Sequence, residues 1–151
     1  MGFLSKLKES AIELQGQLVT QVKQFQNKNF ADATMAVCAL VSAADGTIDT
    51  TERKRTAAFI SSNDMLAVFD VSQLQQSFNT YCDKLVKDFD FGKIDLLQIV
   101  AKLKKTPPQA RAAIQVAVLI AGADGNFDDN EKNVIREICR SLDIDPKEFD
   151  L

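Results

Sequence analysis

Six acidic residues in two similar stretches of the chain could bind a metal ion. Residues 41–52 and 120–131 both contain Ala-Asp-Gly, one variable residue, a large apolar residue and then Asp-x-x-Glu. Carboxylate oxygens are the ligands that hard divalent cations such as Ca²⁺, Mg²⁺ and Mn²⁺ prefer. The candidate metal ligands are therefore Asp45, Asp49, Glu52, Asp124, Asp128 and Glu131.

Both stretches match the second half of an EF-hand calcium loop when they are aligned on Gly46 and Gly125. The acids that normally occupy the first and third positions of such a loop are missing from both, so neither stretch alone supplies a full set of ligands. A pseudo-twofold arrangement would bring the six carboxylates together at one shared site. Unit charges about 4 Å apart repel by about 1–4 kcal/mol, so this cluster would need cations, protonation or a basic partner.

A purely structural explanation is also open. The Asp-x-x-Glu sequences that start at Asp49 and Asp128 have the form of a capping box at a helix N-terminus. The two glycines suit the position just after a helix, where the backbone is often left-handed. Capping does not explain Asp45 and Asp124, because we expect both in the last turn of a helix, where the dipole disfavours a carboxylate by about 0.3–1 kcal/mol. A third interpretation is an acidic docking surface that needs no cation.

Hydrophobic periodicity predicts that these stretches connect the arms of two helical hairpins. The first arms are buried helices at residues 30–44 and 107–123, and the second arms are residues 50–62 and 129–142. No segment alternates with period two. We therefore predict an all-α bundle of about seven helices, built on two pseudo-symmetric hairpins.

The remaining helices are predicted before and between the hairpins. A long amphipathic helix spans residues 3–25, and a further helix is expected at residues 94–103. A capping box at Ser72 and Gln75 opens another helix, which we expect to end at residues 90–92, Asp-Phe-Gly.

All of these elements are assigned to one domain, residues 1–151. The repeat units are approximately residues 30–64 and 107–143. The N-terminal helix lies within residues 1–28, and the intervening helices lie within residues 72–105.

Composition excludes several classes of function. The chain has no histidine, which excludes histidine-based general base catalysis and histidine-ligated metals. Its net charge is −3, without the basic excess typical of nucleic-acid binders. Cys38, Cys82 and Cys139 are far apart and stand among apolar residues, so we expect buried, unreactive thiols. No nucleophile and base pair, phosphate loop or dinucleotide fingerprint is present, so we do not expect an enzyme.

The longest nearly apolar runs, around residues 35–44 and 112–123, are about half as long as a bilayer requires. The N-terminus also lacks the apolar core of a secretory signal. These features predict a soluble, intracellular protein with no transmembrane segment.

The paired Ala-Asp-Gly-x-(Ile/Phe)-Asp-x-x-Glu loops, the helical pattern and the length resemble the TerB family of tellurite resistance proteins over essentially the whole chain. The resemblance implies a bacterial, cytoplasmic stress-response protein that associates with the membrane protein TerC and is peripheral at the inner membrane. It also implies that the acidic residues of the two loops are the candidate metal site, and all six positions match.

We therefore expect a divalent-cation-binding adaptor with a role in tellurite resistance. Its two acidic loops would form one shared site for Ca²⁺, Mg²⁺ or Mn²⁺, and it would dock on a membrane-associated complex. The alternative is a cation-independent interaction scaffold that uses the acidic surface of residues 112–151, which hold nine acids and four bases.

Overall fold

The computed structural model describes residues 27–62, 66–122 and 127–151, and these residues form an all-helical fold. The elements are α2 (Lys28–Ser42), α3 (Thr50–Ser62), α4 (Val71–Lys87), α5 (Phe89–Ala101), the 3₁₀-helix η2 (Lys102–Lys105), α6 (Pro107–Ala121), α7 (Asp129–Ser141) and the 3₁₀-helix η3 (Pro146–Phe149). The all-α prediction is confirmed. The predicted count of about seven is slightly off, because the described residues hold six α-helices. The helix expected at residues 3–25 lies outside the described part of the chain.

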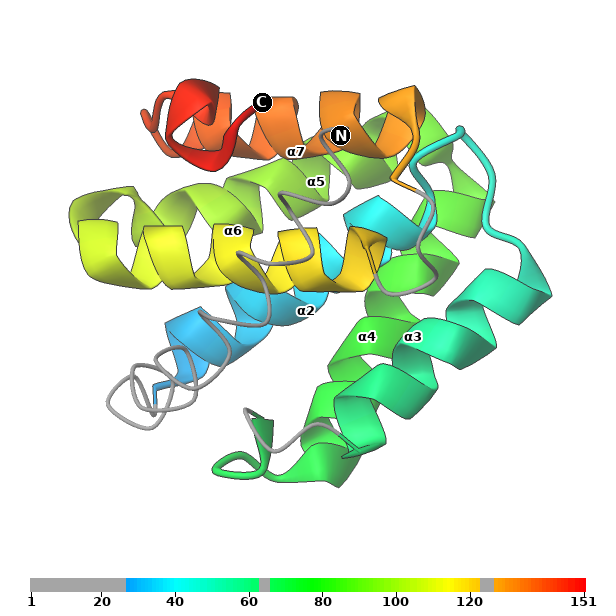
Figure 1. The fold of residues 1–151 in the computed structure, drawn as a ribbon. Helices are drawn as coiled ribbons and strands as arrows, with labels where there is room; N and C mark the ends of the chain where they lie inside the picture. Colours follow the sequence, from blue (N-terminus) through cyan, green and yellow to red (C-terminus); the bar gives the residue numbers. More distant parts are fainter. Residues whose placement is uncertain (1–26, 63–65, 123–126) are drawn as a thin grey trace.

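Helix α2 lies at the centre of the molecule. It packs against α4, α5 and α6, and also contacts α3 and α7. Figure 1 shows α3 and α4 on one side of it and α6 and α7 on the other. A helix that is apolar on all sides can be covered in this way, and its two buried hydroxyls are satisfied within the helix. Thr34 donates to the carbonyl oxygen of Phe30 at 2.7 Å, and Ser42 donates to that of Cys38 at 2.9 Å.

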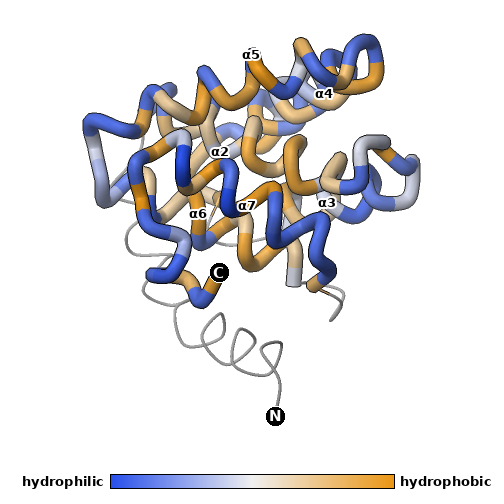
Figure 2. The backbone as a smooth tube through the Cα atoms, turned by 90° about the horizontal axis from the view of Figure 1, so that it is seen from above, coloured by the Kyte–Doolittle hydropathy of each residue, from blue (hydrophilic) through white to orange (hydrophobic). Residues whose placement is uncertain are grey.

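The core is a cluster of buried apolar side chains to which every described α-helix contributes. Figure 2 shows hydrophobic and hydrophilic residues alternating along the helices, as expected for helices with one buried side. The largest fully buried side chains include Phe30, Met35, Phe78, Leu96, Ile114 and Ile138. No helix in the described ranges is both long and apolar enough to cross a membrane.

The boundary between α4 and α5 differs from the sequence prediction. Residues 90–92 were expected to end a helix, but α4 already ends at Lys87 and these residues lie in the first turn of α5. The break is made by Asp88, whose backbone is extended (φ −155°, ψ 103°) and whose side chain caps α5. Gly92 permits close packing instead, because a Cβ atom there would lie 2.8 Å from the carbonyl oxygen of Lys84.

The N-terminus of α4 is also capped differently from the prediction. Asp70 Oδ1 accepts a hydrogen bond from the backbone N–H of Ser72 at 2.9 Å, so Ser72 is inside the helix and is not its cap. The side chain of Gln75 reaches across to α3, where it donates to the carbonyl oxygen of Ala57 at 3.3 Å and to the hydroxyl of Ser61. The expected Ser72 and Gln75 capping box is therefore wrong, and Gln75 ties α4 to α3.

Candidate functional site

Asp45 lies in the turn after α2 and not in the last turn of that helix, as the sequence had predicted. The helix ends at Ser42, and Ala43 is its C-cap. Asp45 Oδ1 accepts hydrogen bonds from the backbone N–H and the hydroxyl of Thr47, both at 3.2 Å. Gly46 has a φ of +93°, the left-handed conformation that glycine adopts readily. The prediction that Asp45 lies in the last turn of a helix is therefore wrong, and the Asp45 side chain closes the turn that follows α2.

The second stretch forms the capping box that the sequence predicted. Asp128 Oδ1 accepts from the backbone N–H of Glu131 at 2.8 Å, and Glu131 Oε1 accepts from the backbone N–H of Asp128 at 3.2 Å. In the first stretch, Asp49 Oδ1 accepts from the backbone N–H of Thr51 at 2.6 Å. Asp124 lies outside the described residues.

Carboxylates from both stretches line one small pocket of about 110 Å³. Its walls come from the end of α2, from α3, from α6 and from the start of α7. The lining residues are Val41, Ser42, Glu52, Arg55, Thr56, Ile120, Asp128 and Glu131. The structure thus brings three of the six predicted ligands to one pocket, namely Glu52, Asp128 and Glu131. Asp45 and Asp49 do not line it.

The pKa of Glu52 reflects this surrounding charge. Burial raises the pKa above its ordinary value, and the negative charges of Asp45 and Asp49 raise it further. The guanidinium of Arg55 opposes these effects, while Asp128 of the second stretch adds to them. The two acidic stretches therefore act electrostatically on the same carboxyl group, and a positive charge in the pocket favours its ionised form.

The donor chemistry of the pocket fits a hard cation. Carboxylate and hydroxyl oxygens are suitable ligands for Ca²⁺, Mg²⁺ or Mn²⁺. Within the described ranges, however, no group of three or more histidine, cysteine, aspartate or glutamate side chains is already arranged to hold a metal. Asp128 and Glu131 each use one carboxylate oxygen to cap α7, and Arg55 lines the same pocket.

A buried pair of hydroxyls forms part of the pocket wall. Ser42 Oγ and Thr56 Oγ1 lie 2.9 Å apart, and Ser42 also donates to the carbonyl oxygen of Cys38 at 2.9 Å. Ser42 has only one hydroxyl hydrogen, so Thr56 must be the donor within the pair. In the second repeat the aligned residues are Ala121 and Ile135. The hydroxyl pair therefore belongs to the first hairpin alone.

Removing one hydroxyl of this pair should destabilise the fold. The Ser42→Ala substitution leaves the buried hydroxyl of Thr56 without an acceptor and should lower the free energy of unfolding by about 1–3 kcal/mol. Adding Thr56→Val removes the stranded donor and should restore most of the loss, because both polar partners are then gone. Urea unfolding of the two single variants and the double variant checks this. A double variant as unstable as the sum of the single variants would contradict the hydrogen bond between the two hydroxyls.

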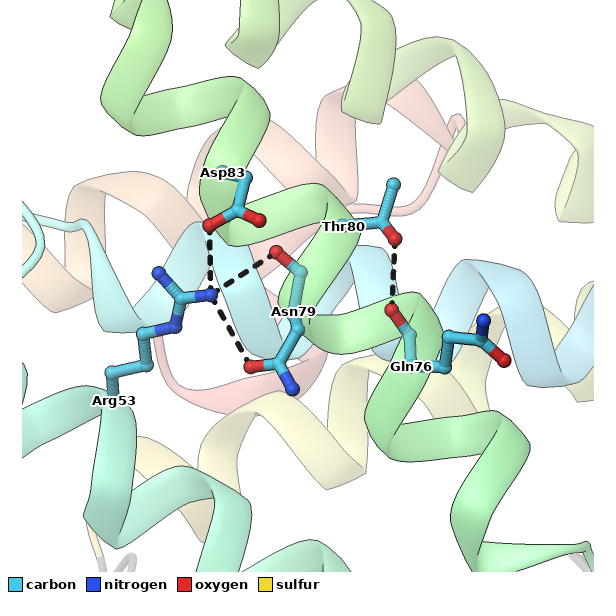
Figure 3. Close-up of polar contacts among 5 residues, drawn as sticks. All are labelled: Arg53, Gln76, Asn79, Thr80 and Asp83. Carbon is cyan, nitrogen blue, oxygen red and sulfur yellow. Dashed lines mark hydrogen bonds and ion pairs between the residues drawn. The ribbon is translucent and has the colours of Figure 1, made fainter.

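Helix α3 is attached to α4 by a different arginine. The guanidinium of Arg53 donates to the backbone and side-chain oxygens of Asn79, both at 3.3 Å, and forms an ion pair with Asp83 at 2.8 Å (Figure 3). Arg55, two residues further along α3, lines the pocket instead. The helix therefore presents one arginine to α4 and the other to the acidic loops.

Three pocket residues were not predicted from the sequence, namely Arg55, Ser42 and Thr56. The available signal was the difference between the two repeats, since the first repeat is polar at these positions and the second is apolar. The aligned residues of the second repeat are Val134, Ala121 and Ile135.

Residues 31–151 match the model of the family described as "Tellurite resistance protein TerB". A curated relative, "Tellurium resistance protein TerB" of Alcaligenes sp, is 32% identical over 122 residues, which cover 78% of this chain and 97% of the relative. No solved structure matches the chain significantly. The family match covers nearly all of the described fold, including the whole pocket, and the chain belongs to the tellurite resistance protein TerB family.

Proposed function

We propose that this protein is a divalent-cation-responsive adaptor that acts in tellurite resistance. Membership of the TerB family supports the role in tellurite resistance. The observation that carries the cation response is the pocket between the hairpins, where Glu52 of α3 meets Asp128 and Glu131 at the start of α7. A cation held by these carboxylates would connect α3 to α7.

By connecting α3 to α7, a bound cation would change the surface that the protein presents to a partner. The acidic side chains repel one another across the pocket, and a bound cation would replace this repulsion with attraction to both hairpins. We propose that the cation-bound form docks on a membrane-associated complex, with TerC as the partner that the family resemblance implies. Docking would then depend on the concentration of Ca²⁺, Mg²⁺ or Mn²⁺.

Nuclear magnetic resonance of ¹⁵N-labelled protein tests the proposal. Adding Ca²⁺ or Mg²⁺ should shift the amide signals of both acidic stretches together, and Mn²⁺ should broaden them together. The Glu52→Gln and Glu131→Gln double variant should weaken binding at least about tenfold, because it removes two of the pocket's negative charges. Glutamine at position 131 still suits a capping box, so the start of α7 should be preserved.

A matched control carries the same change of charge outside the pocket. Asp90→Asn combined with Asp95→Asn alters two acidic residues of α5, which does not line the pocket, and cation binding should stay within about twofold of the original. Tellurite resistance in cells should fall with the pocket variant and persist with the control. Unchanged spectra at millimolar concentrations of all three cations would refute the cation response.

A second candidate is a cation-independent interaction scaffold. Two observations favour it: Arg55 already supplies a positive charge in the pocket, and three large apolar side chains are exposed around the junction of α4 and α5. These are Val86, Phe91 and Ile94, with 65%, 70% and 52% of their surface exposed. Hydrophobic colouring reaches the outer edge of α5 in Figure 2. This candidate predicts that resistance survives the pocket variant and is lost when Phe91 and Ile94 become serine.

A further inference from the structure

Arg55 sits among the acids of the pocket and belongs to the first hairpin only. Of the described residues that line the pocket, Arg55 is the only basic one, against the three acids Glu52, Asp128 and Glu131. The aligned residue of the second repeat is Val134, which is 9% exposed and belongs to the core. The positive charge is therefore a feature of one repeat and not of the shared hairpin design.

The hydroxyl of Thr56 gives an independent indication that the pocket favours a positive occupant. Its side chain lines the pocket, and the residue is only 6% exposed. Its hydrogen is committed to Ser42, so its oxygen has only acceptor lone pairs left for the pocket. The natural complements of such an oxygen are an N–H donor or a cation.

We propose that the guanidinium of Arg55 is the built-in counter-cation of this pocket, and that a divalent cation binds by displacing it. This inference rests on the proposed cation response and names the residue that adjusts its sensitivity to cations. A divalent cation and a guanidinium repel each other twice as strongly as two unit charges at the same distance, so the guanidinium opposes the entry of a divalent cation into the pocket. Arg55 thereby sets the cation concentration at which the adaptor responds.

In the absence of a cation, the charge of Arg55 stabilises the acidic pocket. This positive charge offsets the negative charges of Glu52, Asp128 and Glu131, which line the same pocket. Removing the arginine should therefore strengthen cation binding while weakening the cation-free fold. A residue with only a packing role would not produce these two opposite effects.

Isothermal titration calorimetry with Mg²⁺, Ca²⁺ and Mn²⁺ distinguishes a counter-cation role of Arg55 from a packing role. Arg55→Gln should bind the cations about tenfold more tightly than the original chain, and Arg55→Lys should bind close to the original because it keeps the charge. Arg53→Gln is the matched control on the same helix, and its cation affinity should stay within about twofold. Equal or weaker binding by Arg55→Gln would overturn the displacement model.

Thermal unfolding in a chelator distinguishes this inference from the proposed function. Arg55→Gln should lower the melting temperature, and adding Glu52→Gln should recover part of the loss because the uncompensated acid is then removed. If no variant binds a cation but this coupling is seen, the cation response fails and Arg55 remains the counter-cation. Additive effects of the two substitutions would overturn the role of Arg55 itself.

Discussion

Replacing Phe78 with alanine should lower the free energy of unfolding by about 3–5 kcal/mol. Phe78 has no exposed surface, and it lies on α4, which packs against α2, α3 and α5. The substitution removes a large apolar side chain and leaves a cavity that the surrounding helices can fill only in part. Because a domain of this kind is stable by about 5–15 kcal/mol in total, the loss should be evident in urea unfolding followed by circular dichroism.

Phe91 provides the matched control for this experiment. It is also a helical phenylalanine, but 70% of its surface is exposed on α5. Phe91→Ala should change the free energy of unfolding by no more than about 0.5 kcal/mol. Similar losses for the two substitutions would show that Phe78 does not form part of the stabilising core.

All three cysteine thiols should be protected in the folded protein. Burial raises the pKa of Cys82 and of Cys139 to about 12, and it also raises the pKa of Cys38. The thiolate is the reactive form, so at pH 8 its fraction should be on the order of a thousandfold below that of a free cysteine. Ellman's reagent at pH 8 should therefore react very slowly with the folded chain, in agreement with the prediction that these residues occupy packing positions.

Denatured protein provides the reference for the thiol measurement. In guanidinium chloride, all three thiols should react rapidly, because unfolding removes the burial that raises their pKa values. Rapid release of even one equivalent from the folded chain would contradict the described burial.

The sequence by itself determined the helical class and most of the helices. The expected second arm at residues 50–62 coincides with α3, and the expected arm at residues 129–142 differs from α7 by one residue. Apolar spacing records which side of a helix faces the core, and capping residues mark where it starts, so both can be found from neighbours along the chain. The capping box at Asp128 was predictable for the same local reason.

Only the tertiary structure decided which charged groups share the pocket. Asp45 has the right sequence context for a ligand, but it closes its own turn, whereas Glu52 meets Asp128 across the two hairpins. The roles of Gly92 and Arg55 also depend on tertiary contacts. Gly92 is required because α4 approaches it closely, and Arg55 lines the pocket. Spacing along a helix fixes the direction of a side chain relative to its own axis. It does not specify which distant helix lies opposite, because that depends on how the whole core packs.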